Sequence, residues 1–162
     1  ELMLARAANL AISSNKFTHD DFATFTDHKF LSELDRAGGF PQKTVKDFEN
    51  RRIVKSAVSI TKKQAEDSGL NRSSKEEYEN SIAAKLGLDA SDIYVDLPPL
   101  SVVPGLKVKI LKDNDEVVLA RNLSRLVSGL YEAQFDHWRG RVYGPSGIED
   151  EVSSEASKVL GL

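Results

Sequence analysis

The spacing of apolar residues changes along this chain, and the change limits the folds it can adopt. In the first part, apolar residues recur at helical intervals, as between Leu2 and Ile12 and at Phe30, Leu31 and Leu34. In the second half they alternate with polar residues, first over 92–96. Helices followed by a few strands are typical of the α+β class. We therefore predict an α+β chain, with an N-terminal helical segment followed by a small mixed or antiparallel sheet packed with helices.

Capping residues and glycines set the expected ends of the helices. Thr18 and Thr26 each precede a predicted helix, and Gly38-Gly39 ends the second of these. Pro41 suits the first turn of the next helix. The other predicted helices span 2–14, 75–86 after a Ser73 or Ser74 cap, about 123–137, and 148–160. In the helix at 123–137, an inward apolar face is expected, made of Leu123, Leu126, Val127, Leu130 and Phe135.

The strand signals are of unequal clarity. The segment 92–96 ends before Pro98-Pro99, and 106–110 and 116–119 flank a turn at Asp113-Asn114-Asp115, which predicts a hairpin. A short strand is predicted at 140–144. The β-branched residues of 53–60 favour a strand, but this segment could also begin as the last turn of the preceding helix. The polar residues 61–72 are expected to form a surface connection.

Composition excludes several classes of function. The chain has 22 basic and 25 acidic residues and a net charge of −3, which argues against a dedicated nucleic-acid-binding protein. The absence of cysteine excludes disulfides, thiolate catalysis and cysteine-bound zinc, and it fits a cytoplasmic location. No apolar run reaches the roughly 18–20 residues of a membrane span. The interrupted apolar stretch at the start is not typical of a signal peptide.

No set of residues with the spacing of a catalytic or metal site occurs in the sequence. His19, His28 and His137 are not paired at helical spacing, so we expect them to be structural or surface residues. The acidic clusters at 20–21, 113–116 and 149–151 are typical of caps, turns and helix starts. The phosphate-loop, dinucleotide and nucleophile-elbow motifs are all absent, and the Gly-Pro-Ser-Gly at 144–147 is interpreted as a turn. We predict neither a catalytic residue nor a metal or cofactor site in this chain.

A basic stretch is the strongest electrostatic feature. Residues 51–63 contain five basic side chains and no acid. If the first part is helical, Arg51 and Lys55 project from one face, and a guanidinium beside an ammonium matches a phosphate group. The alternative is a solvated basic face paired with nearby acids such as Asp47, or with a neighbouring subunit.

Ordered motifs across residues 2–144 resemble one protein family. The alanine-rich helix LMLARAANLAI precedes FATFTDHKFLSEL and then ENRRIVKSAV, and the second half has DIYVDLP and RGRVY. This order is similar to the region that follows the HD domain in deoxynucleoside triphosphate triphosphohydrolases. Because the chain begins inside a helical pattern at Glu1, we expect 1–60 to be a helical segment that continues from an HD catalytic domain, and 61–162 to be an α+β lobe.

The resemblance implies a role beside a metal-dependent phosphohydrolase. Such enzymes hold a divalent metal with an H…HD…D set, which lies upstream of every motif matched here. The expected partners are the chain's own HD domain, further copies in a homo-oligomer, and a nucleotide. In the vertebrate-type enzymes, an Arg and a Lys at the positions of Arg51 and Lys55 contact a regulatory nucleotide. Arg52 and Val54 replace the asparagine and the aromatic residue of that motif here.

Two other functions remain open from the sequence. The chain could be a stand-alone interaction module, which the absence of an H…HD…D pattern upstream of Glu1 would favour. It could also bind nucleic acid through residues 51–63, in which case its affinity would fall steeply with added salt.

Overall fold

The computed structural model describes residues 1–99, 108–113 and 115–162, and within them the chain forms two compact units. The first unit comprises residues 1–55 together with Pro145–Gly147, and the second comprises Ser56–Gly144 and Ile148–Leu162. All but the first residue of the strand that begins at Lys55 belongs to the second unit, where this strand is part of a sheet.

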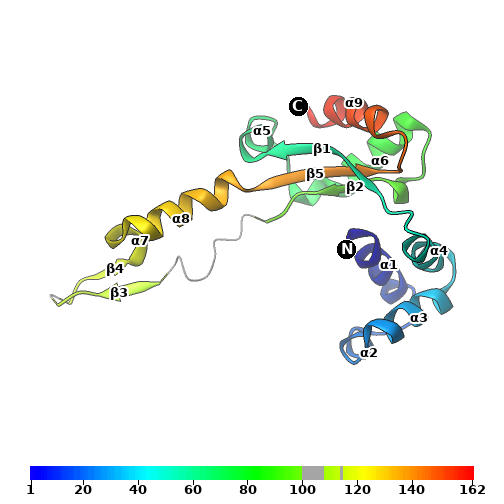
Figure 1. Cartoon of the computed structure of the whole chain (residues 1–162), viewed down its shortest axis with the longest axis horizontal. Helices are drawn as coiled ribbons and strands as arrows, with labels where there is room; N and C mark the ends of the chain where they lie inside the picture. Colours follow the sequence, from blue (N-terminus) through cyan, green and yellow to red (C-terminus); the bar gives the residue numbers. More distant parts are fainter. Residues whose placement is uncertain (100–107, 114) are drawn as a thin grey trace. The chain divides into compact units, whose positions relative to one another are not determined.

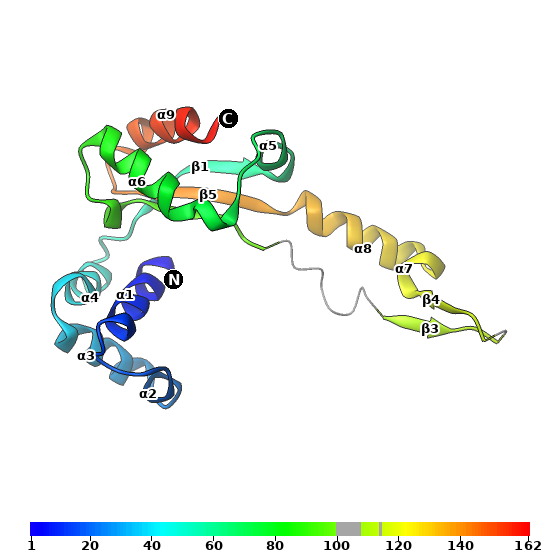
Figure 2. The same cartoon turned by 180° about the vertical axis from the view of Figure 1, so that it is seen from behind.

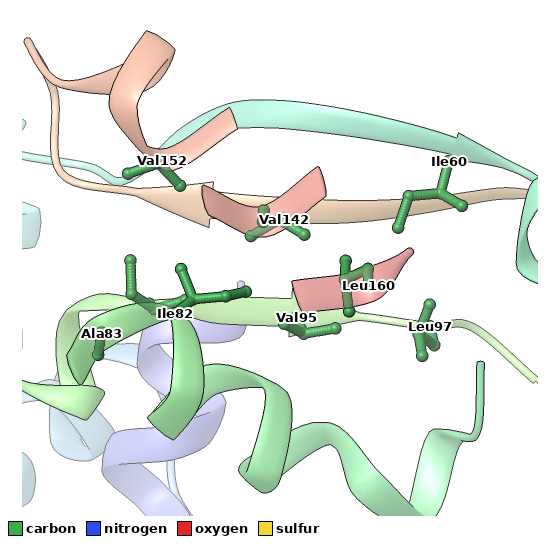
Figure 3. Close-up of a cluster of buried hydrophobic side chains, with 10 residues drawn as sticks. Ile60, Ile82, Ala83, Val95, Leu97, Val142, Val152 and Leu160 are labelled. Carbon is green, nitrogen blue, oxygen red and sulfur yellow. The ribbon is translucent and has the colours of Figure 1, made fainter. Parts of the chain in front are cut away.

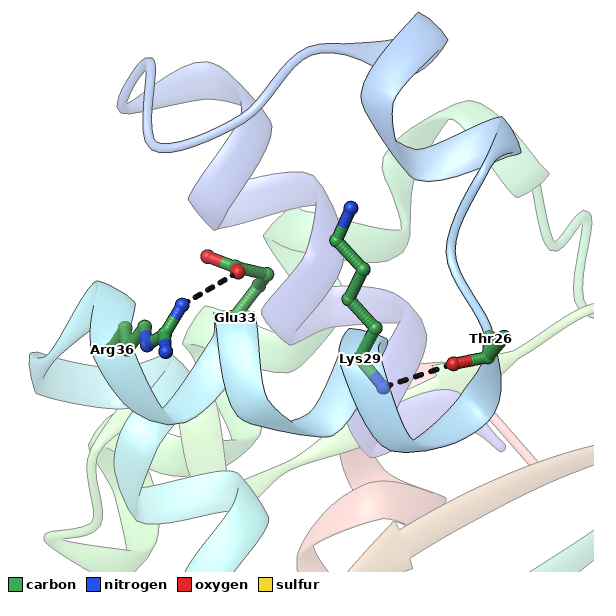
Figure 4. Close-up of polar contacts among 4 residues, drawn as sticks. All are labelled: Thr26, Lys29, Glu33 and Arg36. Carbon is green, nitrogen blue, oxygen red and sulfur yellow. Dashed lines mark hydrogen bonds and ion pairs between the residues drawn. The ribbon is translucent and has the colours of Figure 1, made fainter.

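The first unit contains four helices, which follow one another along its chain (Figure 1). They are α1 (Leu2–Ser13), α2 (His19–Ala23), α3 (Asp27–Ala37) and α4 (Gly39–Glu49). The two predicted threonine caps are confirmed: the Thr18 hydroxyl accepts a hydrogen bond from Asp21 N at 3.1 Å, and the Thr26 hydroxyl accepts one from Lys29 N at 3.3 Å (Figure 4). Further along α3, Arg36 donates to Glu33 at 2.9 Å on the exposed side of the helix.

Small and aromatic side chains form the core of this unit. Ala7 and Ala11 of α1 are buried with Leu34 of α3 and Val45 of α4, so that the alanines allow close approach of the helices. Phe17 lies edge-on to Phe25 with ring centroids 5.3 Å apart, a favoured aromatic geometry. The alanine-rich pattern of 2–14 therefore marks a helix–helix contact surface.

The second unit is built on a three-stranded antiparallel sheet in the order β1-β5-β2 (Figures 1 and 2). These strands are β1 (Lys55–Thr61), β2 (Tyr94–Asp96) and β5 (Arg139–Gly144), and β2 pairs with β5 through Tyr94↔Tyr143 and Val95↔Val142. Three helices accompany this sheet, α5 (Lys62–Asp67), α6 (Lys75–Leu86) and α9 (Glu149–Leu160), with 3-10 turns at Arg72–Ser74 and Ala90–Asp92. The predicted α+β class is confirmed.

The core of the second unit lies between this sheet and the helices α6 and α9 (Figure 3). The fully buried aliphatic residues come from every one of these elements, and they include Ile60, Ile82, Val95, Val142 and Val152. The fit is tight where α9 crosses β5, because a Cβ added at Gly144 would lie 2.8 Å from Val152 Cγ2. A side chain at position 144 would therefore displace Val152 or the strand backbone.

A buried carboxylate joins α6 to the edge strand. Glu79 is only 7% exposed, and its Oε1 accepts a hydrogen bond from Val95 N at 2.8 Å. An unpaired backbone N–H in this position would be costly to bury, so the glutamate satisfies it from the helix side. Because the sequence of α6 is rich in charged residues, it does not indicate that Glu79 in particular is buried.

The other elements described in the second unit are a hairpin and two helices. Strands β3 (Lys109–Leu111) and β4 (Val117–Leu119) pair antiparallel with Ile110 opposite Val118, which confirms the predicted hairpin. The predicted residues Leu106 and Lys107 and the turn residue Asn114 lie outside the described residues. α7 (Ala120–Leu123) packs against β4 and is followed by α8 (Arg125–Asp136).

The inward apolar face expected at 123–137 is wrong in most of its members. Leu126 is 73% exposed, Leu130 is 55% exposed and Leu123 is 49% exposed, whereas Val127 is half-buried. The side chain of Phe135 lies outside the described residues. The expected single helix is also divided at Ser124, whose backbone is extended.

Two other expectations need correction. The segment 61–72 contains the helix α5, whose start is closed by a capping box between Thr61 and Gln64. The alternative in which 53–60 begins as the end of a helix is wrong, because α4 ends at Glu49 and β1 begins at Lys55. Among the described residues, no helix is both long and apolar enough to cross a membrane.

Candidate functional site

The candidate phosphate-binding residue Arg51 lies directly after the C-terminus of α4 and has an unusual backbone conformation. Its φ is 58°, in the left-handed region that residues other than glycine and asparagine rarely adopt. Two hydrogen bonds hold it there: Arg51 N donates to Phe48 O at 3.1 Å, and Arg52 N donates to Asp47 O at 2.7 Å. These are the two bonds of a Schellman motif, with Arg51 at the position that glycine usually occupies.

The same closure ends other helices in the described part of the chain, and there the residue is a favoured one. In α1 the left-handed position is Asn15, with Lys16 N bonded to Ala11 O at 2.9 Å. In α5 and α6 it is Gly69 and Gly87. An arginine at this position costs about 1 kcal/mol of backbone strain relative to glycine. Strain held at an exposed residue is an observation that motivates a functional hypothesis.

Lys55 is the first residue of β1, and its side chain is exposed. In a helix, Arg51 and Lys55 would be one turn apart, about 6 Å between Cα atoms. Since the chain between them is not helical, the two Cα atoms can be separated by as much as about 13 Å. The two residues are therefore not adjacent on one helix face, and a ligand that contacts both must span the segment between them.

The neighbouring basic side chains are partly engaged by acids. Arg52 Nε donates to Asp47 Oδ1 at 2.8 Å, and Lys62 Nζ lies 3.3 Å from Glu66 Oε1. Asp47, an expected partner for the basic stretch, thus pairs with Arg52. The stretch 51–63 follows the end of α4 and continues through the strand β1 into the start of α5, so it is not a single helical face.

The histidines and acidic clusters occupy separate surface positions. His19 starts α2, His28 lies in the first turn of α3, His137 follows α8, and all three are exposed. Asp20 and Asp21 lie in the first turn of α2, where Thr18 donates to Asp21 through both its hydroxyl and its backbone N–H and lowers the pKa of that carboxyl. Within residues 1–99, 108–113 and 115–162, no three metal-binding side chains are grouped together.

Two features of the structure are not predicted from the sequence, one in each unit. The left-handed conformation of Arg51 could not be predicted from its residue type, because glycine, and not arginine, is typical of this position after a helix. The exposed leucines of α8 were interpreted as core because an apolar stripe looks the same whether it faces the interior or a partner.

Comparison with known protein families identifies the group to which this chain belongs. Residues 1–162 match the family described as "HD associated region", and the chain is a member of that family. The family match confirms the resemblance to a region associated with an HD domain. A comparison with curated proteins found no match.

Proposed function

We propose that this chain is the non-catalytic region that accompanies the HD domain of a metal-dependent phosphohydrolase, with nucleotides as the expected substrate class. It completes the core beside the catalytic domain, contributes to a homo-oligomer, and presents Arg51 and Lys55 to a phosphate group, in the cytoplasm. Membership in the HD associated region family carries the first part of this proposal. The divalent metal would be held by the HD domain, since the described residues here group no set of ligands for it.

The strained arginine supports the phosphate contact. Arg51 has a guanidinium fork suited to two phosphate oxygens, and Lys55 adds a second positive charge further along the backbone. Glycine or asparagine would close α4 at lower cost, so the presence of an arginine at this position supports a function for its side chain. A di- or triphosphate is long enough to contact two cations that are not on one helical turn.

A thermal-shift experiment with tripolyphosphate and a panel of deoxynucleotides tests this contact. The melting temperature of the wild-type chain should rise with the logarithm of the ligand concentration once that concentration exceeds the dissociation constant. Arg51→Gly should raise the stability of the free chain by up to about 1 kcal/mol, because the strain is relieved, and it should abolish the stabilisation by ligand. Lys55→Ala should reduce ligand stabilisation without the gain in stability.

Asn15→Gly is the matched control, because it makes the same backbone change at the end of α1 and removes no cation. It should leave the response to ligand unchanged. If no phosphate compound stabilises the wild-type chain, or if Asn15→Gly and Arg51→Gly alter the response equally, the phosphate contact is wrong.

A second experiment tests whether this chain lacks catalytic activity of its own. The isolated chain should not hydrolyse deoxynucleoside triphosphates in Mg²⁺ or Mn²⁺. Hydrolysis that is lost in His19→Ala or Asp20→Ala would place the chemistry in this chain and would overturn the proposal.

A further inference from the structure

Among the described residues of the second unit, the helix α8 has an apolar face whose large side chains are exposed. Leu126, Gly129, Leu130 and Ala133 follow one another at intervals of three, one and three residues, which places them in a single stripe along the helix. We call these four residues the α8 face. Its two leucines are 73% and 55% exposed, more than most of the large apolar side chains described in this chain.

Charged residues border the α8 face along one flank. Arg125 lies in the first turn of α8, and Glu132 and Asp136 follow on the same flank, two and three turns later. All three side chains are exposed. The flank is therefore basic at the start of the helix and acidic at its end.

We infer that the α8 face binds the α8 face of a second copy of this chain, with the two helices antiparallel about a two-fold axis near Leu130. In an antiparallel helix pair, equivalent flanks face each other in reversed order. Arg125 of one copy then lies beside Glu132 and Asp136 of the other, and the contact occurs twice. In a parallel pair, this flank would face the opposite flank of the partner and the charges would not meet.

The sizes of the residues agree with the same arrangement. A Cβ added to Gly129 would have no atom within 4 Å, so open space lies above this glycine in the middle of the helix. Glycine costs a helix interior about 1 kcal/mol relative to alanine, and no contact among the described residues explains its presence here. Gly129 and Ala133 let the two backbones approach closely, and the leucines of each copy fill the space above the small residues of the other.

This inference assigns an interface to the homo-oligomer of the proposed function, and it rests on that proposed function. The test is the mass of the 162-residue chain measured by sedimentation velocity over a wide range of concentrations. The wild-type chain should change from monomer to dimer as its concentration rises. Leu130→Glu should raise the dissociation constant at least about tenfold, because a carboxylate would be desolvated without a partner. Leu10→Glu, at an exposed leucine of α1, is the matched control and should leave the dimer unchanged.

A charge exchange tests the antiparallel orientation. Arg125→Glu should weaken the dimer, and combining it with Glu132→Arg and Asp136→Arg should restore it, because the reversed flank is again self-complementary. If the wild-type chain stays monomeric throughout, or if Leu130→Glu dimerises as the wild type does, the inference is wrong. If the triple variant is no tighter than Arg125→Glu, the antiparallel pairing is wrong.

The remaining occupant to exclude is the HD domain of the same polypeptide. In the complete protein, loss of hydrolytic activity in Leu130→Glu with an unchanged oligomer mass would assign the α8 face to the catalytic domain and would overturn this inference. The proposed companion role would survive that result. Conversely, nucleotide hydrolysis by the isolated chain would contradict the companion role and would not affect the conclusion from the dimer measurement.

Discussion

Two helices of the second unit have the same length, but the apolar stripe of one is buried and the leucines of the other are exposed. α8 (Arg125–Asp136) and α9 (Glu149–Leu160) each contain 12 residues and carry an apolar stripe. On α9, the stripe of Val152, Ala156 and Leu160 is at most 2% exposed, packed with β5 and α6. On α8, the two leucines of the stripe remain largely exposed. An apolar stripe therefore predicts that a surface will be covered, but not which molecule covers it.

The largest expected difference between the two helices comes from placing a charge on each stripe. Val152→Asp buries an unpaired carboxylate in a completely enclosed position, and it should cost about 4 kcal/mol or more, enough to unfold the second unit. Leu126→Asp should change stability by no more than about 0.5 kcal/mol. Urea denaturation at a concentration where the chain is monomeric compares the two. Equal losses would mean that the α8 face is buried within the chain.

Adding a methyl group to one glycine beside each helix sharpens the comparison. Gly144→Ala should destabilise the chain by about 1–3 kcal/mol, because the new Cβ would lie 2.8 Å from Val152 Cγ2. The double variant Gly144→Ala/Val152→Ala should cost less than the sum of the two single changes. Additive losses in urea denaturation would show that the clash is not the cause.

Gly129→Ala should have the opposite sign. A Cβ at this position meets no atom within 4 Å, so the alanine should stabilise the monomer by about 1 kcal/mol through its better helix propensity. The same change should weaken the proposed dimer, because it fills the space above the helix. Thermal denaturation of the monomer and sedimentation of the dimer measure these two effects separately. A Gly129→Ala chain that is less stable as a monomer would contradict the open space above the helix.

The smallest expected effect concerns an exposed pair on α9. Lys158 donates a hydrogen bond to Glu155, which lowers the pKa of that carboxyl. Because the folded pKa is lowered, the contribution to stability is present above the ordinary pKa of glutamate and is lost as the pH falls through the lowered value. Lys158→Met should raise the pKa of Glu155 toward its ordinary value, as followed by NMR titration, with little change in melting temperature. A pKa that does not move would assign the shift to another cause.

Local signals predicted most of the elements in this chain. The threonine caps at Thr18 and Thr26, the helix at 75–86 ended by Gly87, and the hairpin around residues 109–119 are all present as expected. Each depends on a short-range interaction, such as a side chain bonded to a backbone N–H three residues away. The helix α5 could have been predicted in the same way, since Thr61 and Gln64 have the spacing of a capping box.

The strand order of the sheet and the backbone conformation at the end of α4 could not be predicted from local patterns. The strand β5 lies between β1 and β2, although it follows both in the chain, and no local pattern indicates that order. The helical alternative for Arg51 and Lys55 failed because residues after Glu49 leave the helix through a left-handed arginine. Local propensity disfavours that conformation, and the closing bonds to Asp47 and Phe48 hold it in place.

By itself, the sequence determined the α+β class, the positions of most helices and strands, and the absence of cysteine chemistry, because periodicity, capping and composition act over a few residues. Only the tertiary structure decided that β5 is central, that a side chain at position 144 would displace Val152 or the strand backbone, and that the stripe of α9 is buried while the leucines of α8 are exposed. The reason is that burial depends on the surface brought opposite each residue. That surface comes from parts of the chain, or from a second molecule, that lie far away in sequence.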